Sequence, residues 1–231
     1  MARVAKIDNA LKKRLERRET TRAINSRQKL VYFLIVCEGE KTEPNYFKAL
    51  ERELPRGTIE LRIDGTGLNT LGVVDYAIRQ RKIACRNFDR LWVVFDKDGF
   101  DSENFNSAIL KAKQNGFGCA WSNEAFELWF LLHFQFINHS MSRTEYASFI
   151  EKEIRAKSKD NQYIYQKNSS DTYRLLQKFG NRMQAINWAK KLRSAFNDQR
   201  YATHNPATCV YELIEELLNP QLILEALDGE E

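Results

Sequence analysis

An unbroken apolar run, residues 91–95, ends in two aspartates with a single lysine between them. A run of this length that is rich in Val and aromatic residues is typical of a strand buried on both faces. Asp and Gly are poor strand formers, so the strand is expected to end within residues 96–99. If the backbone stays extended through Lys97, the Asp96 and Asp98 side chains point to the same side.

Two carboxylates so placed would lie at the carboxyl end of a strand, which is where ligands bind in open parallel sheets. Close carboxylates repel each other, and a hard cation such as Mg²⁺ relieves that repulsion. The alternative is a strand that ends in a solvated acidic turn, and the run alone leaves both interpretations open.

A second unbroken apolar run, residues 30–37, precedes Glu38. Further strands are expected at 59–63 and 116–121. Helices are expected to follow a cap at Thr42, to cover about 70–85 and 104–115, and to follow a cap at Ser122. This alternation predicts an α/β sandwich with a mostly parallel, four-stranded sheet and right-handed crossovers.

The composition changes near residue 141, where Lys, Arg, Gln and Asn become frequent and apolar residues fall at helical spacing. We therefore predict a helical C-terminal region, 141–231, after a catalytic domain at 30–140. Within that region, Asn205 and Pro206 are expected to start a helix.

The first 29 residues form a basic arm, with ten basic and three acidic residues and a net charge of +7. Since the whole chain carries +5, the remainder is slightly acidic. Such an arm suits a polyanionic partner, although a solvated leader is the alternative. The candidate nucleic-acid-binding residues in the arm are Lys12, Lys13, Arg14, Arg17 and Arg18.

The sequence also indicates in which cellular compartment the protein is expected. No continuous apolar span of membrane length and no secretory signal is seen, so we expect a cytoplasmic protein without a membrane partner. The four cysteines are widely spaced and form no CxxC pair, which indicates reduced thiols rather than a zinc site or disulfides.

Acids follow two of the predicted strands: Glu38 after the first, and Asp96 and Asp98 after the third. In this order the chain resembles the Toprim fold shared by topoisomerases, primases and OLD-type nucleases. The resemblance implies that these three residues are catalytic and gather around Mg²⁺ or Mn²⁺ and a phosphodiester. Gly39 would permit a sharp turn and the close approach of a phosphate.

Four segments narrow the resemblance: 37–47, 95–98, 122–129 with His133, and 205–208. Together they resemble the RloB family, over about residues 30–218. That family is similar to the AbiL-type phage-exclusion proteins of bacteria and is often encoded beside an ATPase. The resemblance implies a metal-dependent endonuclease of antiviral defence that cleaves tRNA, other RNA or DNA, with an ATPase partner. It leaves a homodimer open.

Several residues are secondary candidates. Glu43 matches a similarly spaced Glu that serves a second metal in OLD-type nucleases, or it is an acid that favours a helix N-terminus. Lys41 and Lys97 are candidates for contact with a phosphate, or they are simply exposed. Both lysines are therefore predicted as nucleic-acid-binding residues.

A third group of candidates follows the fourth predicted strand. Glu124 and Glu127 would share one helix face, after Asn123. Glu127 is favoured as a metal ligand because an acid flanked by aromatic residues is costly to bury unless it is paired or metal-bound. An exposed helix face is the alternative. His133 is either a core histidine or a contact to phosphate.

Two other classes of protein compete with a nuclease. Phosphatases of the haloacid-dehalogenase type also place Asp-x-Asp-Gly after an apolar strand, but usually after the first strand of the domain and with Thr after the Gly. A non-catalytic nucleic-acid-binding subunit of a defence complex would use the basic arm and would not need Glu38, Asp96 and Asp98 together.

Overall fold

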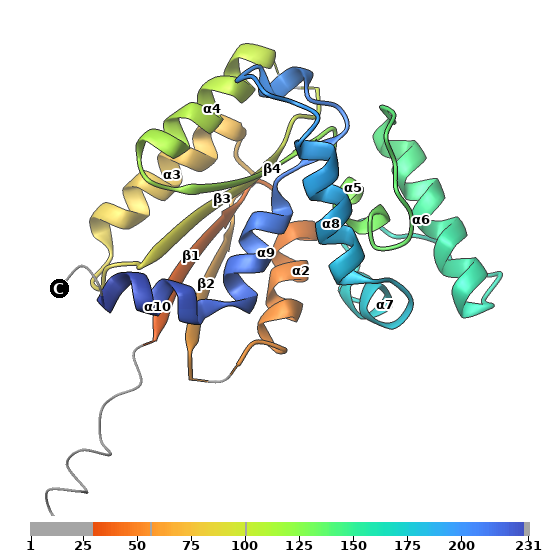
Figure 1. The fold of residues 1–231 in the computed structure, drawn as a ribbon, viewed down its shortest axis with the longest axis horizontal. Coiled ribbons are helices and arrows are strands. Elements are labelled where there is room, and N and C mark those ends of the chain that lie inside the picture. The colour runs from red at the N-terminus through yellow and green to blue at the C-terminus, as the bar shows by residue number, and fades with distance from the viewer. Residues whose placement is uncertain (1–29, 56, 100, 229–231) are drawn as a thin grey trace, which may run out of the picture.

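A computed structural model describes residues 30–55, 57–99 and 101–228. The predicted basic arm, with its five candidate nucleic-acid-binding residues, lies outside the described residues. The centre of the molecule is a five-stranded sheet in the order β2-β1-β3-β4-β5 (Figure 1). The strands are β1 (Val31–Cys37), β2 (Ile59–Gly65), β3 (Arg90–Asp96), β4 (Gly118–Asn123) and β5 (Ala207–Thr208).

Nine helices and one 3₁₀ turn are found in the described part of the chain. They are α2 (Thr42–Glu51), α3 (Thr70–Ile83), α4 (Ser102–Gln114), α5 (Glu127–Leu131), α6 (Arg143–Ser158), α7 (Thr172–Phe179), α8 (Arg182–Arg193), η1 (Tyr201–Thr203), α9 (Val210–Leu218) and α10 (Pro220–Asp228). Within these described residues, none of the helices has the length and apolar character that crossing a bilayer requires.

Alternate residues of the central strands pack into two separate apolar layers. Phe33 and Ile35 of β1 face a layer shared with α2 and with the helices from α5 to α9. Leu34 and Val36 of the same strand face a layer shared with α3 and α4. Both faces of β1 and β3 are therefore covered, which explains why these strands are unbroken apolar runs.

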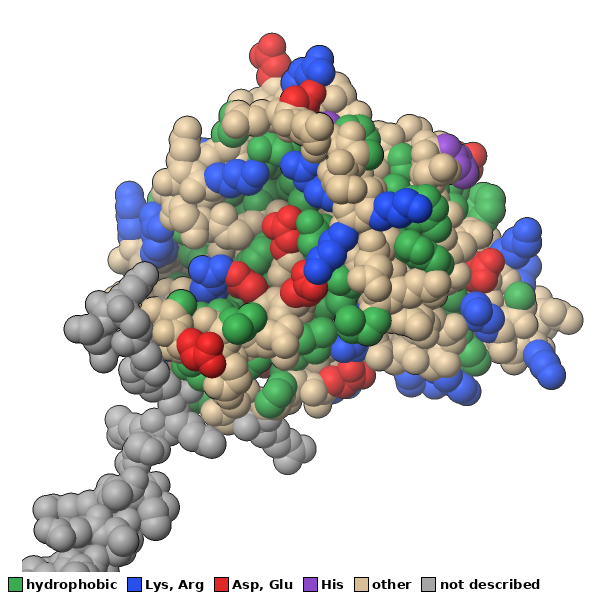
Figure 2. All heavy atoms as spheres, viewed as in Figure 1, with side chains coloured by type: hydrophobic (Ala, Val, Ile, Leu, Met, Phe, Trp, Pro, Cys, Tyr) green, Lys and Arg blue, Asp and Glu red, His purple; other side chains and the backbone are tan. Residues whose placement is uncertain are grey.

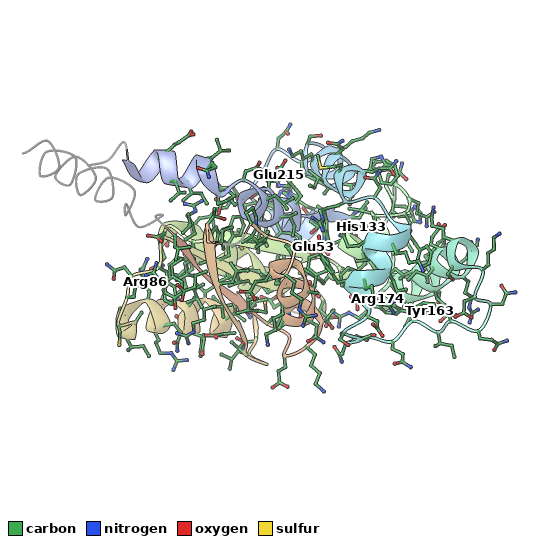
Figure 3. The ribbon with its side chains drawn as sticks, turned by 90° about the horizontal axis from the view of Figure 1, so that it is seen from below. Glu53, Arg86, His133, Tyr163, Arg174 and Glu215 are labelled. Atoms are coloured by element: carbon green, nitrogen blue, oxygen red, sulfur yellow. The ribbon has the colours of Figure 1, made fainter. Side chains whose placement is uncertain are left out.

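The helical part of the chain extends the molecule beyond the sheet. Figure 3 shows Tyr163 and Arg174, from the loop before α7 and from α7 itself, at one end of the molecule and Arg86 at the other. Figure 1 shows α6, α7 and α8 on the right of the view, past α2 and α9, which pack on the sheet. This arrangement lets a loop between α6 and α7 reach back to α2, where the Asn168 backbone carbonyl accepts a hydrogen bond from Asn45 Nδ2.

The prediction of an α/β fold with a mostly parallel sheet is confirmed, but the expected number of strands was wrong. β1 pairs in parallel with β2 and β3, and β3 pairs in parallel with β4. The fifth strand, β5, pairs antiparallel to β4. With two residues it is too short to show an alternating pattern in the sequence.

Three expected helix starts were also wrong. Ser122 lies in β4, where its hydroxyl pairs with that of Thr208, so it does not cap a helix. Asn205 and Pro206 precede β5, and α9 begins only at Val210. Thr42 is the first residue of α2 rather than its cap, and its hydroxyl donates to Asn168 Oδ1.

Candidate functional site

The strand order creates a crevice between the carboxyl ends of β1 and β3. The chain leaves β1 through α2 on one face of the sheet, and it leaves β3 through α4 on the opposite face. At such a switch point the two connections diverge and leave an opening, which is where open α/β sheets bind ligands. Glu38 follows β1 directly, and Asp96 is the last residue of β3.

A cavity of about 320 Å³ occupies this position. It is acidic on the side of the sheet and basic on the side of the helical region. Its lining residues are Glu38, Gly39, Thr42, Glu43, Asp96, Asp98, Arg143, Lys167 and Asn168. The structure thus brings the three predicted catalytic acids, together with Glu43, to one cavity.

Glu38 is held by the backbone of β3. Its N–H donates to the Val94 carbonyl at 2.9 Å, and its Oε2 accepts from the Asp96 N–H at 3.0 Å. Burial raises the pKa of Glu38 to about 7, although the hydrogen bond from the Asp96 N–H opposes this rise. Near neutral pH this carboxyl group can therefore both accept and release a proton.

Asp96 and Asp98 share one cation, the Arg143 guanidinium. Arg143 Nη2 lies 3.2 Å from Asp96 Oδ2, and Nη1 lies 3.1 Å from Asp98 Oδ2. A shared direction of these side chains was expected only if the backbone stayed extended through Lys97, and that condition is not met, because β3 ends at Asp96 and Asp98 has a φ of 38°. The two side chains meet through the turn rather than through strand geometry.

Burial leaves two carboxylate oxygens of the cavity without any donor. Asp96 Oδ1 and Glu43 Oε2 are both buried and unpaired, and each residue is only 6% exposed. Burial raises the pKa of Asp96 well above its usual range, and the charges of Glu43 and Glu127 add to this rise. Burial also raises the pKa of Glu43, again with a contribution from Glu127.

Gly39 makes this crowding possible. A β-carbon at this position would collide with the Glu43 carboxylate, so a larger residue would push that side chain out of the cavity. The role of Gly39 is therefore to leave room for an acid of the site.

The remaining predicted residues lie around the cavity rather than in its wall. Glu127 is 2% exposed and begins α5, but it is not among the lining residues. Glu124 lies before α5, so the two acids do not share a helix face as expected. Lys41 is exposed at the start of α2, and Lys97 is half-buried in the turn after β3.

Asn123 and His133 are engaged elsewhere in the fold. Asn123 Nδ2 donates to the Ala202 carbonyl at 2.9 Å. His133 is 1% exposed, and its Nδ1 lies 2.9 Å from the Trp129 carbonyl (Figure 3). The structure therefore supports the interpretation of His133 as a core histidine.

Sequence reasoning missed the basic side of the cavity. Arg143, Lys167 and Asn168 come from the start of α6 and the loop that follows this helix. One signal was available for Arg143: it follows Ser142, which forms a capping box with Glu145. A cation in the first turn of a helix opposes the macrodipole, so a nearby acidic partner was to be expected.

The donors of the cavity fit a hard divalent cation in their chemistry. Carboxylate oxygens are the ligands that Mg²⁺ and Mn²⁺ prefer, and two buried ones have no other partner. Among the described residues, no three acidic, His or Cys side chains are already grouped as a complete metal site. A bound divalent cation would therefore have to draw the carboxylates of the cavity closer together, and Asp96 and Asp98 now pair with Arg143 instead.

A second cavity, of about 740 Å³, is found elsewhere among the described residues. It lies where β3 begins, and it is lined by Arg90 and by residues of α9 and α10. Arg90 and Trp92 are bound there to Glu216. This cavity is thus at the opposite end of the strand from the acids.

Comparison with known proteins identifies one family. Residues 33–217 match the family described as RloB-like protein. No curated protein and no solved structure matches the chain significantly. Because the match covers most of the chain, including every acid of the cavity, the protein belongs to the RloB-like family.

Proposed function

We propose that this protein is a metal-dependent nuclease of the Toprim type, which cleaves phosphodiester bonds in RNA or DNA. One observation supports the proposal above all others: four carboxylates line one cavity at the carboxyl ends of β1 and β3. Acids after the first and third strands are also what the Toprim resemblance implies. An acidic cluster with buried, unpaired oxygens is unfavourable for folding, so a functional reason for it is expected.

We assign Asp96 and Asp98 as metal ligands, and Glu38 as a ligand or general base. Glu43 is assigned to a second metal, because one of its oxygens is buried and unpaired. The role of Glu127 as a ligand stays a prediction. Bound Mg²⁺ or Mn²⁺ supplies charge neutralisation at the phosphate and lowers the pKa of a coordinated water.

The residues of the chain contribute orientation and proton transfer. A backbone hydrogen bond to Val94 fixes the main chain of Glu38, and the hydrogen bond from the Asp96 N–H to Oε2 orients its carboxyl group. Burial raises the pKa of Glu38 to about 7 in the metal-free site, and the charge of a bound cation would lower it, so the ionised carboxylate could accept a proton from water at neutral pH. Lys167 lies in the wall contributed by the helical region, where an ammonium group can bind a phosphate oxygen.

The charge of residues 141–200, the first part of the helical region, is consistent with a nucleic-acid substrate. Residues 141–200 contain thirteen basic and six acidic residues, for a net charge of +7. Figure 2 shows Lys and Arg side chains gathered at the end of the molecule where α6, α7 and α8 lie. Because Arg143 and Lys167 connect this region to the cavity, a polyanion bound there would reach the acids.

The direct test is incubation of the purified chain with labelled tRNA, single-stranded RNA and DNA, and duplexes of each. We expect internal cuts in at least one substrate with Mg²⁺ or Mn²⁺ and none in EDTA. Binding without cleavage under all conditions would favour a non-catalytic subunit instead. Phosphate release from p-nitrophenyl phosphate without any cleavage would favour a phosphatase.

The family resemblance extends the proposal to biology. We propose a role in bacterial antiviral defence, together with an ATPase partner. Co-expression with an ATPase encoded beside this gene, followed by phage challenge, tests this role. Protection that is lost with the Asp96→Asn variant would support it, and protection unchanged by that variant would contradict it.

A further inference from the structure

Arg143 occupies the place between Asp96 and Asp98 that a cation would take. Its guanidinium reaches both carboxylates through two different nitrogens, at 3.2 and 3.1 Å. The Asp96 side chain is 9% exposed, that of Arg143 32% and that of Asp98 43%, so the Asp96 half of this pairing is shielded from water and the Asp98 half is open to it. The guanidinium can still hold the two acids together without a metal.

The backbone that presents Arg143 is fixed. Ser142 and Glu145 form a capping box at the start of α6, and Tyr146, Ile150 and Ile154 are fully buried on the same helix. Movement of Arg143 away from the acids therefore needs only rotation of its side chain. No refolding of α6 is required.

The ion pair between Arg143 and the two aspartates leaves several buried polar atoms around it without a hydrogen-bond partner. Arg143 Nε is buried without an acceptor, while Asp96 Oδ1 and Glu43 Oε2 are buried without a donor. The cation also sits in the first turn of α6, where the macrodipole is unfavourable for positive charge. A divalent cation brings twice the charge and accepts more than two carboxylates, so it satisfies these acids better than Arg143 does.

We propose that Arg143 holds Asp96 and Asp98 together in the metal-free protein and that a divalent cation displaces it. This inference rests on the proposed function, since it assumes that the cavity binds Mg²⁺ or Mn²⁺. The displacement makes Arg143 a competitor of the metal. Its removal is therefore expected to tighten metal binding.

The test is isothermal titration calorimetry of the full chain with MgCl₂ and MnCl₂, in the wild type, Arg143→Gln and Arg143→Lys. Arg155→Gln is the matched control, because Arg155 lies on the same helix and pairs with Glu151 away from the cavity. We expect Arg143→Gln to bind metal about tenfold more tightly or better, since each charge-assisted hydrogen bond that the metal must break costs at least that factor. Arg143→Lys should lie between, because an ammonium lacks the planar fork.

The metal-free proteins provide a second readout. Without metal, Arg143→Gln should unfold at a lower temperature than the wild type, because Asp96 then has no partner. That deficit should disappear at saturating metal. If Arg143→Gln does not fold, the metal affinity of Arg143→Lys tests the proposal, and it should be higher than that of the wild type.

Two negative outcomes are distinguishable. If the wild type binds metal and the Arg143 variants bind it equally or more weakly, the displacement is wrong and the metal centre stands. If neither the wild type nor any variant binds metal, the proposed metal centre fails, and the displacement fails with it.

Discussion

At the scale of single residues, the buried His133 has a structural role that makes the stability of the protein depend on pH. Burial lowers the pKa of His133 to about 4. The unfolded chain binds this proton at a pKa of roughly 6.5, so between these values only the unfolded state is protonated. The histidine therefore lowers the stability of the protein as the pH falls from about 6.5 to 4.

The variant His133→Asn should remove this part of the pH dependence. Its amide can still donate to the Trp129 carbonyl, and it does not titrate. Between about pH 6.5 and 4, the free energy of unfolding should fall in both proteins, and the fall should be up to about 3 kcal/mol smaller in the variant than in the wild type. Urea denaturation at a series of pH values measures this difference; parallel curves would show that His133 is already protonated in the fold.

The site residues that the sequence predicted are those that follow unbroken apolar runs. Glu38 comes directly after β1 and Asp96 is the last residue of β3, so strand pattern alone brings them to one sheet edge. Arg143 and Lys167 were missed because no local pattern links a helix start or a loop to a distant strand end. Their position depends on how the helical region packs, which only tertiary structure reveals.

At the scale of elements, β5 is the part of the sheet that the sequence did not predict. Its two residues pair with Ser122 and Asn123 at the end of β4. The buried hydroxyls of Ser122 and Thr208 lie 2.9 Å apart, and Thr208 Oγ1 also accepts from the Val210 N–H. A buried polar pair of this kind fixes the register of an otherwise very short strand.

Because the Ser122 and Thr208 hydroxyls bind each other, the stability losses caused by substituting these two residues should not be additive. Thr208→Val keeps the shape but leaves the Ser122 hydroxyl without its partner, which should cost about 1–3 kcal/mol of stability. Adding Ser122→Ala should recover part of this loss, because no unpaired hydroxyl then remains. Thermal or urea unfolding of the four proteins measures the coupling; strictly additive losses would mean that the hydroxyl pair does not stabilise β5.

Two helices differ in how well their expected bounds agree with the structure. Asp101 caps α4 by accepting from the Glu103 and Asn104 N–H groups, and the helix lies close to its expected bounds. α5 is shorter than expected because β4 runs on through Asn123. Competition between a strand and a helix for the same residues is decided by pairing with β5, which is distant in sequence.

At the scale of the whole molecule, charge is segregated along the chain. The first 29 residues and residues 141–200 each carry +7, residues 30–140 carry −2, and residues 201–231 contain seven acidic and no basic residues. The acidic cavity thus belongs to the least charged of these segments, next to a basic one. This distribution favours binding of a polyanion beside the acids rather than on them.

Deletion of residues 1–29 should weaken nucleic-acid binding and reduce its dependence on salt. With fewer phosphate contacts, fewer counterions are released on binding. The slope of log affinity against log salt concentration should therefore become shallower by about 0.7–0.9 for each contact that is lost. The basic region 141–200 should preserve some binding. Filter binding at several salt concentrations measures the slope, and an unchanged slope would show that the arm has another use.

The central claim is that the Asp96 carboxylate binds the metal for phosphodiester cleavage. Asp96→Asn keeps the volume and hydrogen-bonding capacity of the side chain but removes the charge. Without metal, the variant should be as stable as the wild type or more stable, because repulsion from Glu43 and Glu127 is relieved. Asp75→Asn is the matched control, since Asp75 is exposed and pairs with Lys111 outside the cavity.

The decisive measurement is the rate of metal-dependent cleavage by these three proteins, on a substrate that the wild type cuts. We expect Asp75→Asn to retain the wild-type rate. We expect Asp96→Asn, although folded, to lose at least a factor of several hundred, on the scale of roughly 3–4 kcal/mol for a key electrostatic group. Cleavage by folded Asp96→Asn at the wild-type rate would show that the Asp96 carboxylate does not bind the catalytic metal.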